Sequence, residues 1–567
     1  MVLPAVRRPE LRAADTSSAA VTSRGVASGF TRLISPLRLA AVLAVVAALA
    51  SALTMLVRLP VLLSATYRYS DAPELSYIAQ GLATGHGPQT LPTQTSIIVV
   101  WLQELVSPLP FHAAFDFLVG PVLALIAIAV MVLTARRLMG QHAWHASAVV
   151  LLVLPPTVLW TLLFPDNHVT TILGMALLAW LLVSDLTARG RRGANVFVGL
   201  LCGVLTVSDP QLLVTGVIPY IVVGLTARWR WRDVAVRPFL ITAAGVAAGA
   251  VGTEIVMAMQ GIHLLSAMPG TPLALNVTNG AAIAVQTAVW MALGSWYGAA
   301  VTATGIAVLS VALLAVGVAI LRSRRTPRVA RETPAGDVAS FGYRCFWLVG
   351  IAGLLAAFLV LGYGHQPLDG HYLMPCYFGA AALGAAWFTS ARPQAMTTRP
   401  RLRGQAAVAA ATLAFAAFAA HTAYANATID PANFNDHRAV SGASDPLAAL
   451  TAHHLSRGYA GYWLAYDLDW RSEGALSVWP VLAATAACGG QGGSLCAYPF
   501  APQGEYTPAT GASFIVTESI AGRCLPAVPP LSVFGAPTAV YRVGTTTVSV
   551  YSYDVATRFS RVTEIFC

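Results

Sequence analysis

The chain has 567 residues, of which 56% are hydrophobic and only 10% are charged. This composition excludes an ordinary soluble enzyme and indicates a polytopic membrane protein. All 34 basic residues are Arg, so their positions along the chain decide what the net charge of +10 means.

Residues 1–37 are polar and contain several Arg, and no small-residue cleavage site follows a short apolar core. We therefore expect a cytoplasmic tail and a retained membrane span rather than a removed signal peptide. The segment "QTSIIVVWLQELV" (94–106) is expected to form a re-entrant or interfacial helix. Eleven apolar runs have the length needed to cross about 30 Å of hydrocarbon: 38–58, 115–135, 145–163, 168–187, 194–208, 211–227, 238–257, 295–321, 345–363, 371–389 and 405–424.

Arg residues gather in alternate loops, and the intervening loops carry almost none. Cytoplasmic loops of membrane proteins are rich in Arg and Lys. The pattern therefore places the N-terminus on the cytoplasmic side of the plasma membrane. With eleven spans, the C-terminus lies on the outer side. Membrane topology accounts for the positive net charge, so no nucleic-acid partner is expected. The loop "RWRWR" is interpreted mainly as a topology signal, with contact to anionic lipid as the less favoured alternative. The Arg-rich loops are "ARR" (135–137), "RGRR" (189–192), "RWRWR" (228–232), "RSRRTPRVARE" (322–332) and "RPQAMTTRPRLR" (392–403).

The composition changes near residue 425, which divides the chain into a membrane domain (38–424, with a first outer loop at 59–114) and a C-terminal region (425–567). In the latter, "ALSVWPV", "SFIVTES" and "TTTVSVYSYD" are typical of strands, and "DPLAALTAHHLSRG" is typical of a helix. The sequence thus predicts an α-helical polytopic membrane protein with a small extracytoplasmic α/β domain.

Four of the seven Cys lie in this outer region, where disulfides persist. Cys488 and Cys496 flank a Gly-rich turn, which favours a bond between them, whereas the partner of Cys524 stays open. The remaining cysteines, in spans or at their ends, are expected to be packing residues: Cys202, Cys345 and Cys376.

No acidic residue is predicted near the middle of a span. A charge there would be costly and would mark an ion path, so its absence disfavours a proton- or sodium-coupled carrier. The acids instead lie at the outer ends of spans or in outer loops, as expected for a site open to the outside: Asp71, Glu74, Glu104, Asp116, Asp166, Asp209, Glu254 and Asp369.

The stretch "DAPELSYIAQGLA" begins like a capping box, with Asp71 as N-cap, Pro73 in the first turn and Glu74 three residues on. Its apolar residues recur at helical spacing, which predicts an amphipathic helix on the membrane surface. Capping explains both acids without chemistry, although an N-cap side chain can also be aimed at a site. The apolar stripe is Leu75, Ile78, Ala79 and Leu82.

The first outer loop, "SDAPELSYIAQGLATGHG", resembles that of the C-superfamily (GT-C) of membrane glycosyltransferases, especially the protein mannosyltransferase-like branch. "DGHYLMPCYFG" (369–379) is similar to that family's "RYLLP"-type entry to a late span, with His371 in place of the usual Arg. The "GYAGYWLAYDLDW" stretch of the tail is similar to the outer domain of bacterial members. Ala72 departs from the family, which often has a second acid there.

The resemblance implies an enzyme that transfers a sugar from a polyprenyl-phosphate donor to a glycan, lipid or protein acceptor on the outer face. It assigns the role of catalytic base to Asp71, with Asp166 as the candidate second acid. The phosphate that leaves with the lipid needs hydrogen-bond donors or cations to stabilise its charge. The candidates for donor phosphate or substrate binding are Arg68, Glu74, His86, His168, His365, His371 and Tyr372.

No cofactor is firmly implied. "FPDNH" (164–168) offers Asp166 and His168 as a divalent-metal pair, but no spacing suggests a tight metal site. Two other classes stay open. A transporter would be favoured by inverted repeats, which the chain lacks, and a non-catalytic scaffold of envelope assembly would fit the altered residues Ala72 and His371.

Overall fold

The computed structural model describes most of both predicted regions, and every structural statement below concerns the residues it describes. These are 36–66, 71–83, 85, 90–92, 95–109, 112–139, 144–163, 168–187, 191–265, 273–293, 334–361, 367–391, 401–429, 444–472, 475–483, 495–498, 501, 503–518 and 533–559.

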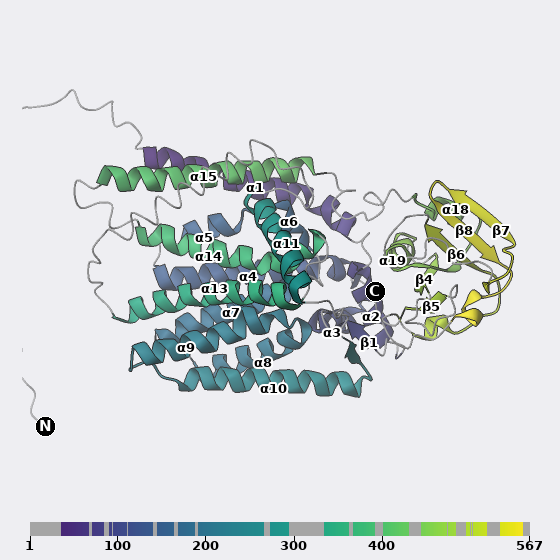
Figure 1. Ribbon diagram of the computed structural model, residues 1–567, viewed down its shortest axis with the longest axis horizontal. Coiled ribbons are helices and arrows are strands. Elements are labelled where there is room, and N and C mark those ends of the chain that lie inside the picture. Colours follow the sequence, from purple (N-terminus) through teal and green to yellow (C-terminus); the bar gives the residue numbers. More distant parts are fainter. Residues whose placement is uncertain are drawn as a thin grey trace, which may run out of the picture.

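The N-terminal region is a bundle of helices, and a sheet domain lies at one end of it (Figure 1). Six helices are long and apolar enough to cross a membrane, which makes this a multi-pass membrane protein. The elements are α1 (Pro36–Thr66), α2 (Asp71–Ala83), α3 (Ile97–Val106), α4 (His112–Met139), α5 (Trp144–Leu151), α6 (Pro156–Leu163), α7 (Val169–Leu186), α8 (Arg192–Ser208), the π-helix η1 (Leu213–Val217), α9 (Ile218–Arg230), α10 (Arg237–Met259), α11 (Leu273–Leu293), α13 (Pro334–Leu361), the 3₁₀ helix η2 (Pro367–Leu373), α14 (Met374–Ala391) and α15 (Arg401–Thr428).

Ten of the eleven predicted spans coincide with helices or helix pairs, and the eleventh, 295–321, lies outside the described residues. The predicted helix at 94–106 is α3. The sequence did not predict α11, because Asn276, Asn279 and Gln286 lower the mean hydropathy of an otherwise apolar run.

The Arg-rich ends of several helices meet at one end of the bundle. The Arg137 guanidinium, on α4, donates to the Ser184 hydroxyl near the end of α7 and lies 5.2 Å from the ring centroid of Trp180. Arg230, on α9, lies 5.8 Å from the ring of Phe341 near the start of α13. The sheet domain lies at the opposite end (Figure 1), so the alternation of Arg along the sequence corresponds to two ends of one bundle.

The predicted span 145–163 is interrupted between α5 and α6, where Pro155 and Pro156 stop the helical hydrogen bonding. Backbone carbonyls freed in a membrane domain need other donors. The Tyr377 hydroxyl donates to the carbonyl of Val153, and the Asn426 amide donates to that of Leu154 at 3.0 Å. Side chains of α14 and α15 therefore stabilise the break.

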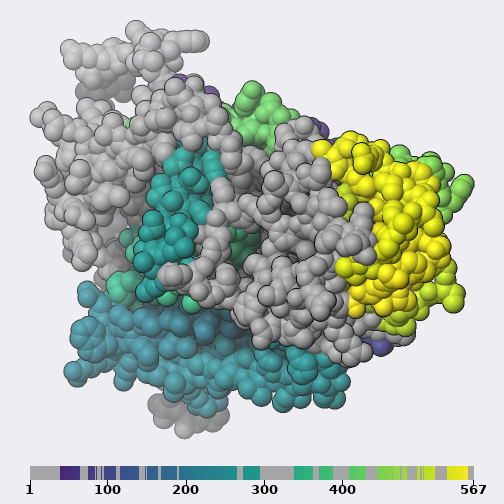
Figure 2. Space-filling model, turned by 45° about the vertical axis from the view of Figure 1, so that its right-hand side comes forward, coloured from purple at the N-terminus to yellow at the C-terminus, as the bar shows by residue number. Residues whose placement is uncertain are grey.

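Helices α8 and α10 pack through a seam of glycines that leaves no room for side chains. A methyl group on Gly203 would collide with the carbonyl oxygen of Val246, and one on Gly249 with that of Leu200. Small residues four apart allow this close backbone approach in membrane helices. Helix α10 lies on the surface of the bundle (Figure 2). Its exposed residues include Leu240, 62% accessible, and Met259, 83% accessible, as expected beside lipid.

We expect Gly203→Ala and Gly249→Ala to destabilise the membrane domain by about 1–3 kcal/mol each, the usual cost of overpacking. The measurement is the thermal unfolding temperature of purified protein in detergent. The matched control is Gly252→Ala on the same helix, because nothing lies within 4 Å of its added methyl. Equal melting temperatures for Gly249→Ala and Gly252→Ala would contradict the packing assignment.

The C-terminal region contains a six-stranded sheet in the order β5-β4-β3-β6-β8-β7, with β3 parallel to both β4 and β6. Helix α19 connects β3 to β4. The three predicted strands are confirmed as β4, β6 and β8, and the predicted helix as α18; β3, β5, β7 and α19 were missed. The elements are α18 (Leu447–Ala452), β3 (Arg457–Gly461), α19 (Tyr462–Arg471), β4 (Ser477–Ala483), β5 (Leu495–Ala497), β6 (Ser513–Glu518), β7 (Ala539–Val543) and β8 (Thr546–Tyr551).

A second, two-stranded sheet joins two segments of the bundle. Strand β1 (Thr90–Pro92) follows α2, and β2 (His263–Leu265) follows α10. They pair in parallel, with Thr90 opposite His263.

Cys496, on β5, is disulfide-bonded, but its partner lies outside the described residues, so the bond to Cys488 stays a prediction. The three cysteines expected to be packing residues are free, with Cys202 fully buried and the other two half-buried. Cys524 and Cys567 also lie outside the described residues.

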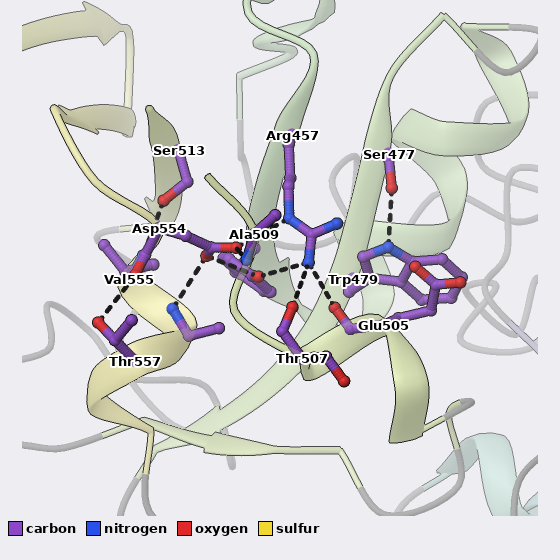
Figure 3. A network of polar contacts seen from close by, with 12 residues as sticks. Arg457, Ser477, Trp479, Glu505, Thr507, Ala509, Ser513, Asp554, Val555 and Thr557 are labelled. Atoms are coloured by element: carbon purple, nitrogen blue, oxygen red, sulfur yellow. Dashed lines mark hydrogen bonds and ion pairs between the residues drawn. The ribbon is translucent and has the colours of Figure 1, made fainter. Parts of the chain in front are cut away.

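Polar contacts inside the sheet domain join the end of the described chain to β3 (Figure 3). Arg457 Nε donates to Asp554 Oδ2 at 3.0 Å, and its Nη2 donates to the carbonyl of Glu505 at 2.8 Å. Burial acts to raise the pKa of Asp554, but the N–H groups of Ala509 and Ala556, together with Tyr459 and Arg457, hold it below the ordinary value. Each member has a partner inside the domain, so we assign this network to stability.

Candidate functional site

A buried histidine and aspartate meet at the end of the bundle that faces the sheet domain. His168 immediately precedes α7, and Asp209 follows α8. His168 Nδ1 lies 2.5 Å from Asp209 Oδ2, and both side chains are 4% exposed. His168 has a left-handed backbone, with φ +58°, which is uncommon for a residue other than Gly and recurs at functional sites.

Asp209 is held from several sides. The Thr171 hydroxyl donates to Oδ2 at 2.5 Å, and the backbone N–H of Gln211 donates to Oδ1 at 3.0 Å. Burial acts to raise the pKa of Asp209, but His168 and these donors bring it below its ordinary value. The contact with Asp209 through Nδ1 fixes the orientation of the His168 ring, and Nε2 is the ring nitrogen that can take another partner.

The 3₁₀ helix η2 brings two aromatic side chains against His168. The His371 ring lies nearly parallel to that of His168, with centroids 5.6 Å apart, and the Tyr372 ring lies 5.1 Å from His168. Gly370 allows η2 to lie close against α11, because a methyl group there would collide with the Thr287 hydroxyl of α11. Two imidazoles this close would repel each other if both were charged, unless an anion lay beside them.

A small apolar groove of about 60 Å³ lies beside this cluster. Its lining includes exposed Leu361, on the outside of the bundle. Gln211 is 8% exposed, and its side-chain carbonyl oxygen is buried with no hydrogen-bond partner among the described residues. The groove therefore leads from an apolar surface to a polar end next to Asp209. It is lined by Pro210, Gln211, Val214, Leu354, Ala357, Phe358 and Leu361.

Helix α2 begins at Asp71 and lies between the bundle and the sheet domain. Its apolar stripe, predicted to lie on the membrane surface, is instead buried in protein. Leu75, Ile78 and Ala79 are each 1% exposed and pack in one cluster with residues of α3, α4 and α10. The predicted helix is present, but the prediction that its apolar stripe lies on the membrane surface is wrong. An apolar stripe at helical spacing does not show whether lipid or protein covers it.

The other side of α2 contacts the sheet domain. The Tyr462 hydroxyl donates to Glu74 Oε2 at 2.6 Å. The Tyr77 ring stacks on that of Tyr466 at 5.3 Å, and its hydroxyl lies near the carboxyl of Asp469. Burial raises the pKa of Asp469 to about 6.

The structure brings together three of the predicted site residues, His168, His371 and Tyr372. Glu74 belongs to the contact with the sheet domain. Asp71 is the first residue of α2, and nothing is described of its side chain. The sequence missed Asp209 and Thr171 as members of the histidine cluster. The other predicted residues lie outside the described part of the chain: Arg68, His86, Asp166 and His365.

Within the described ranges, no three His, Cys, Asp or Glu side chains form a group that could hold a metal ion. The Asp166–His168 pair stays untested.

No protein-family model matches the sequence, and no curated protein matches it. Among solved structures, ArnT from Cupriavidus metallidurans bound to undecaprenyl phosphate is 12% identical, with a TM-score of 0.47 over 88% of this chain and 97% of that one. The oligosaccharyltransferase AglB from Archaeoglobus fulgidus, in complex with an inhibitory peptide and a dolichol-phosphate, is 10% identical, with a TM-score of 0.40 over 78% and 64%. At TM-scores below 0.5, the chemistry has to be argued from the residues of this chain.

Proposed function

We propose that this protein is a glycosyltransferase that takes a sugar from a polyprenyl-phosphate donor and acts at the outer face of the plasma membrane. The observation that carries the proposal is the His168–Asp209 pair, with His371 stacked on it, beside a groove that opens on the apolar surface. A phosphate with a long apolar chain fits this juxtaposition, because imidazoles can donate to the phosphate while the groove covers the first part of the chain.

In the proposed reaction, the acceptor hydroxyl oxygen forms a bond to the anomeric carbon of the sugar. The bond from that carbon to the phosphate oxygen breaks, and the electron pair leaves with polyprenyl phosphate. The acceptor proton goes to the carboxylate of Asp71, the general base that the first-loop resemblance implies. His168 and His371 stabilise the charge that develops on the leaving phosphate.

The test is transfer of radiolabelled sugar from polyprenyl phosphate to endogenous acceptors in membranes that contain the protein. Transfer above that of membranes lacking it is expected. If purified protein moved intact lipid-linked sugar between leaflets of a vesicle without cleaving it, the transporter alternative would replace the proposal. If it did neither with any donor, the scaffold alternative would.

The proposed orientation has its own test, by cysteine labelling of intact cells with a membrane-impermeant reagent. Trp229, 86% exposed at the Arg-rich end, and Val540, 47% exposed in the sheet domain, are suitable positions. We expect Val540→Cys to be labelled in intact cells and Trp229→Cys only after lysis, as the Arg distribution predicts. The reverse pattern would overturn the orientation and with it the outer location of the site.

A further inference from the structure

We propose that the sheet domain positions α2 for the reaction, through Tyr462 on Glu74 and Asp469 on Tyr77. Tyr462 and Asp469 are then positioning residues, and the C-terminal domain is part of the catalytic apparatus. The link to activity rests on the proposed function, whereas the link to the position of α2 does not.

The burial of α2 on both sides supports this role. Leu75 and Ile78 pack in the bundle, and Glu74, which is 6% exposed, lies at the border of this face and contacts the sheet domain. Hydrogen bonds between a hydroxyl and a carboxylate are directional and strong where water is excluded. The contact with Tyr462 therefore fixes the rotation and height of α2, which apolar packing alone constrains less sharply.

The contact also lies close to the proposed base. Asp71 and Glu74 are three residues apart on α2, so their backbones are about one helical turn from each other. A shift of α2 at Glu74 would move Asp71 by a similar amount. Misplacement of a reacting group by about 1 Å can reduce the rate on the order of 100-fold.

The sheet domain has a further anchor on the bundle, because the Trp470 ring packs edge-on against Phe117 of α4 at 5.7 Å. The hydroxyl contacts to α2 can therefore be removed while this anchor remains. An experiment can therefore test the hydroxyl contacts without detaching the sheet domain from the bundle.

The experiment combines Tyr462→Phe with Tyr77→Phe, which removes both hydroxyls and keeps the rings. The matched control is Tyr553→Phe, whose hydroxyl donates to the carbonyl of Phe534 at 2.6 Å inside the sheet domain. Spin labels on Ala83→Cys, at the end of α2, and on Val540→Cys report the distance between α2 and the sheet domain. Cys202, Cys345 and Cys376, which are free among the described cysteines, are replaced by Ala in every sample.

We expect one narrow distance distribution in the parent and the control, and a broad one in the double variant, with transfer reduced about 10- to 100-fold. An unchanged distribution in the double variant would overturn the inference. So would a broadened distribution with full transfer. If no sample transfers sugar, the proposed function fails, while the distance measurement still decides whether the two hydroxyls hold α2.

Discussion

Asp71→Asn is expected to reduce sugar transfer by roughly 10²- to 10⁴-fold, the usual contribution of a general base, with little change in thermal stability. Asn is about as good a helix N-cap as Asp, so the start of α2 should be preserved. The variant lacks only the group that would receive the acceptor proton. The measurement is the turnover of radiolabelled donor in membranes, normalised to protein content.

The control is Glu104→Gln, a half-buried acid on the neighbouring helix α3, which should keep full transfer. Glu74→Gln is unsuitable as a control, because Glu74 accepts from Tyr462. Full activity of Asp71→Asn would reduce Asp71 to a helix cap and make Asp166 the candidate base.

His168→Gln is expected to raise the KM for the polyprenyl-phosphate donor about 10- to 100-fold, since a hydrogen bond to a charged group contributes about 1.5–3 kcal/mol. The reason is the loss of the imidazole that Asp209 orients toward the proposed phosphate site. The control is His263→Gln, an exposed residue on β2, which should leave the KM unchanged. A KM equal to that of the parent would remove His168 from donor binding.

The dependence of His168 on Asp209 can be measured by a double-mutant cycle. Asp209→Asn alone should raise the donor KM, and it should add little in the presence of His168→Gln, because residues that act through one contact are not additive. Additive effects would show that Asp209 acts independently of His168. Melting temperatures of all four proteins identify any loss that comes from unfolding.

Ten of the predicted spans coincide with helices, and six of these helices are long and apolar enough to cross a membrane, because length and hydropathy act locally and each apolar run can be recognised without its neighbours. The failures have a common cause in tertiary context. Helix α11 carries Asn276, whose amide donates to the carbonyl of Val360 on α13 at 3.5 Å. The hydropathy of the sequence gives no information about this partner on another helix. Strand β3 is the short run "RGYAG", in which glycines hide the β pattern.

The candidate site was predicted in part. Histidines are rare in this chain and stand out in outer segments, so His168 and His371 could be singled out from sequence. Asp209 could be placed at the outer end of a span, but its pairing with His168, 41 residues earlier, depends on how α7 and α8 pack. Glu74 and Tyr462 are 388 residues apart in the sequence, so no local sequence pattern could predict their contact.

The pairing of β1 with β2 limits how often the chain can cross the membrane. Strands joined by backbone hydrogen bonds lie on one side of the bilayer, so an even number of crossings separates residue 92 from residue 263. The same parity holds between residue 265 and the sheet domain, because Glu74, which lies on the helix directly before β1, contacts Tyr462. If α13, α14 and α15 each cross once, residues 266–333 must supply an odd number of crossings. Any topology of the chain must therefore keep the two-stranded sheet and the six-stranded sheet on the same side of the membrane.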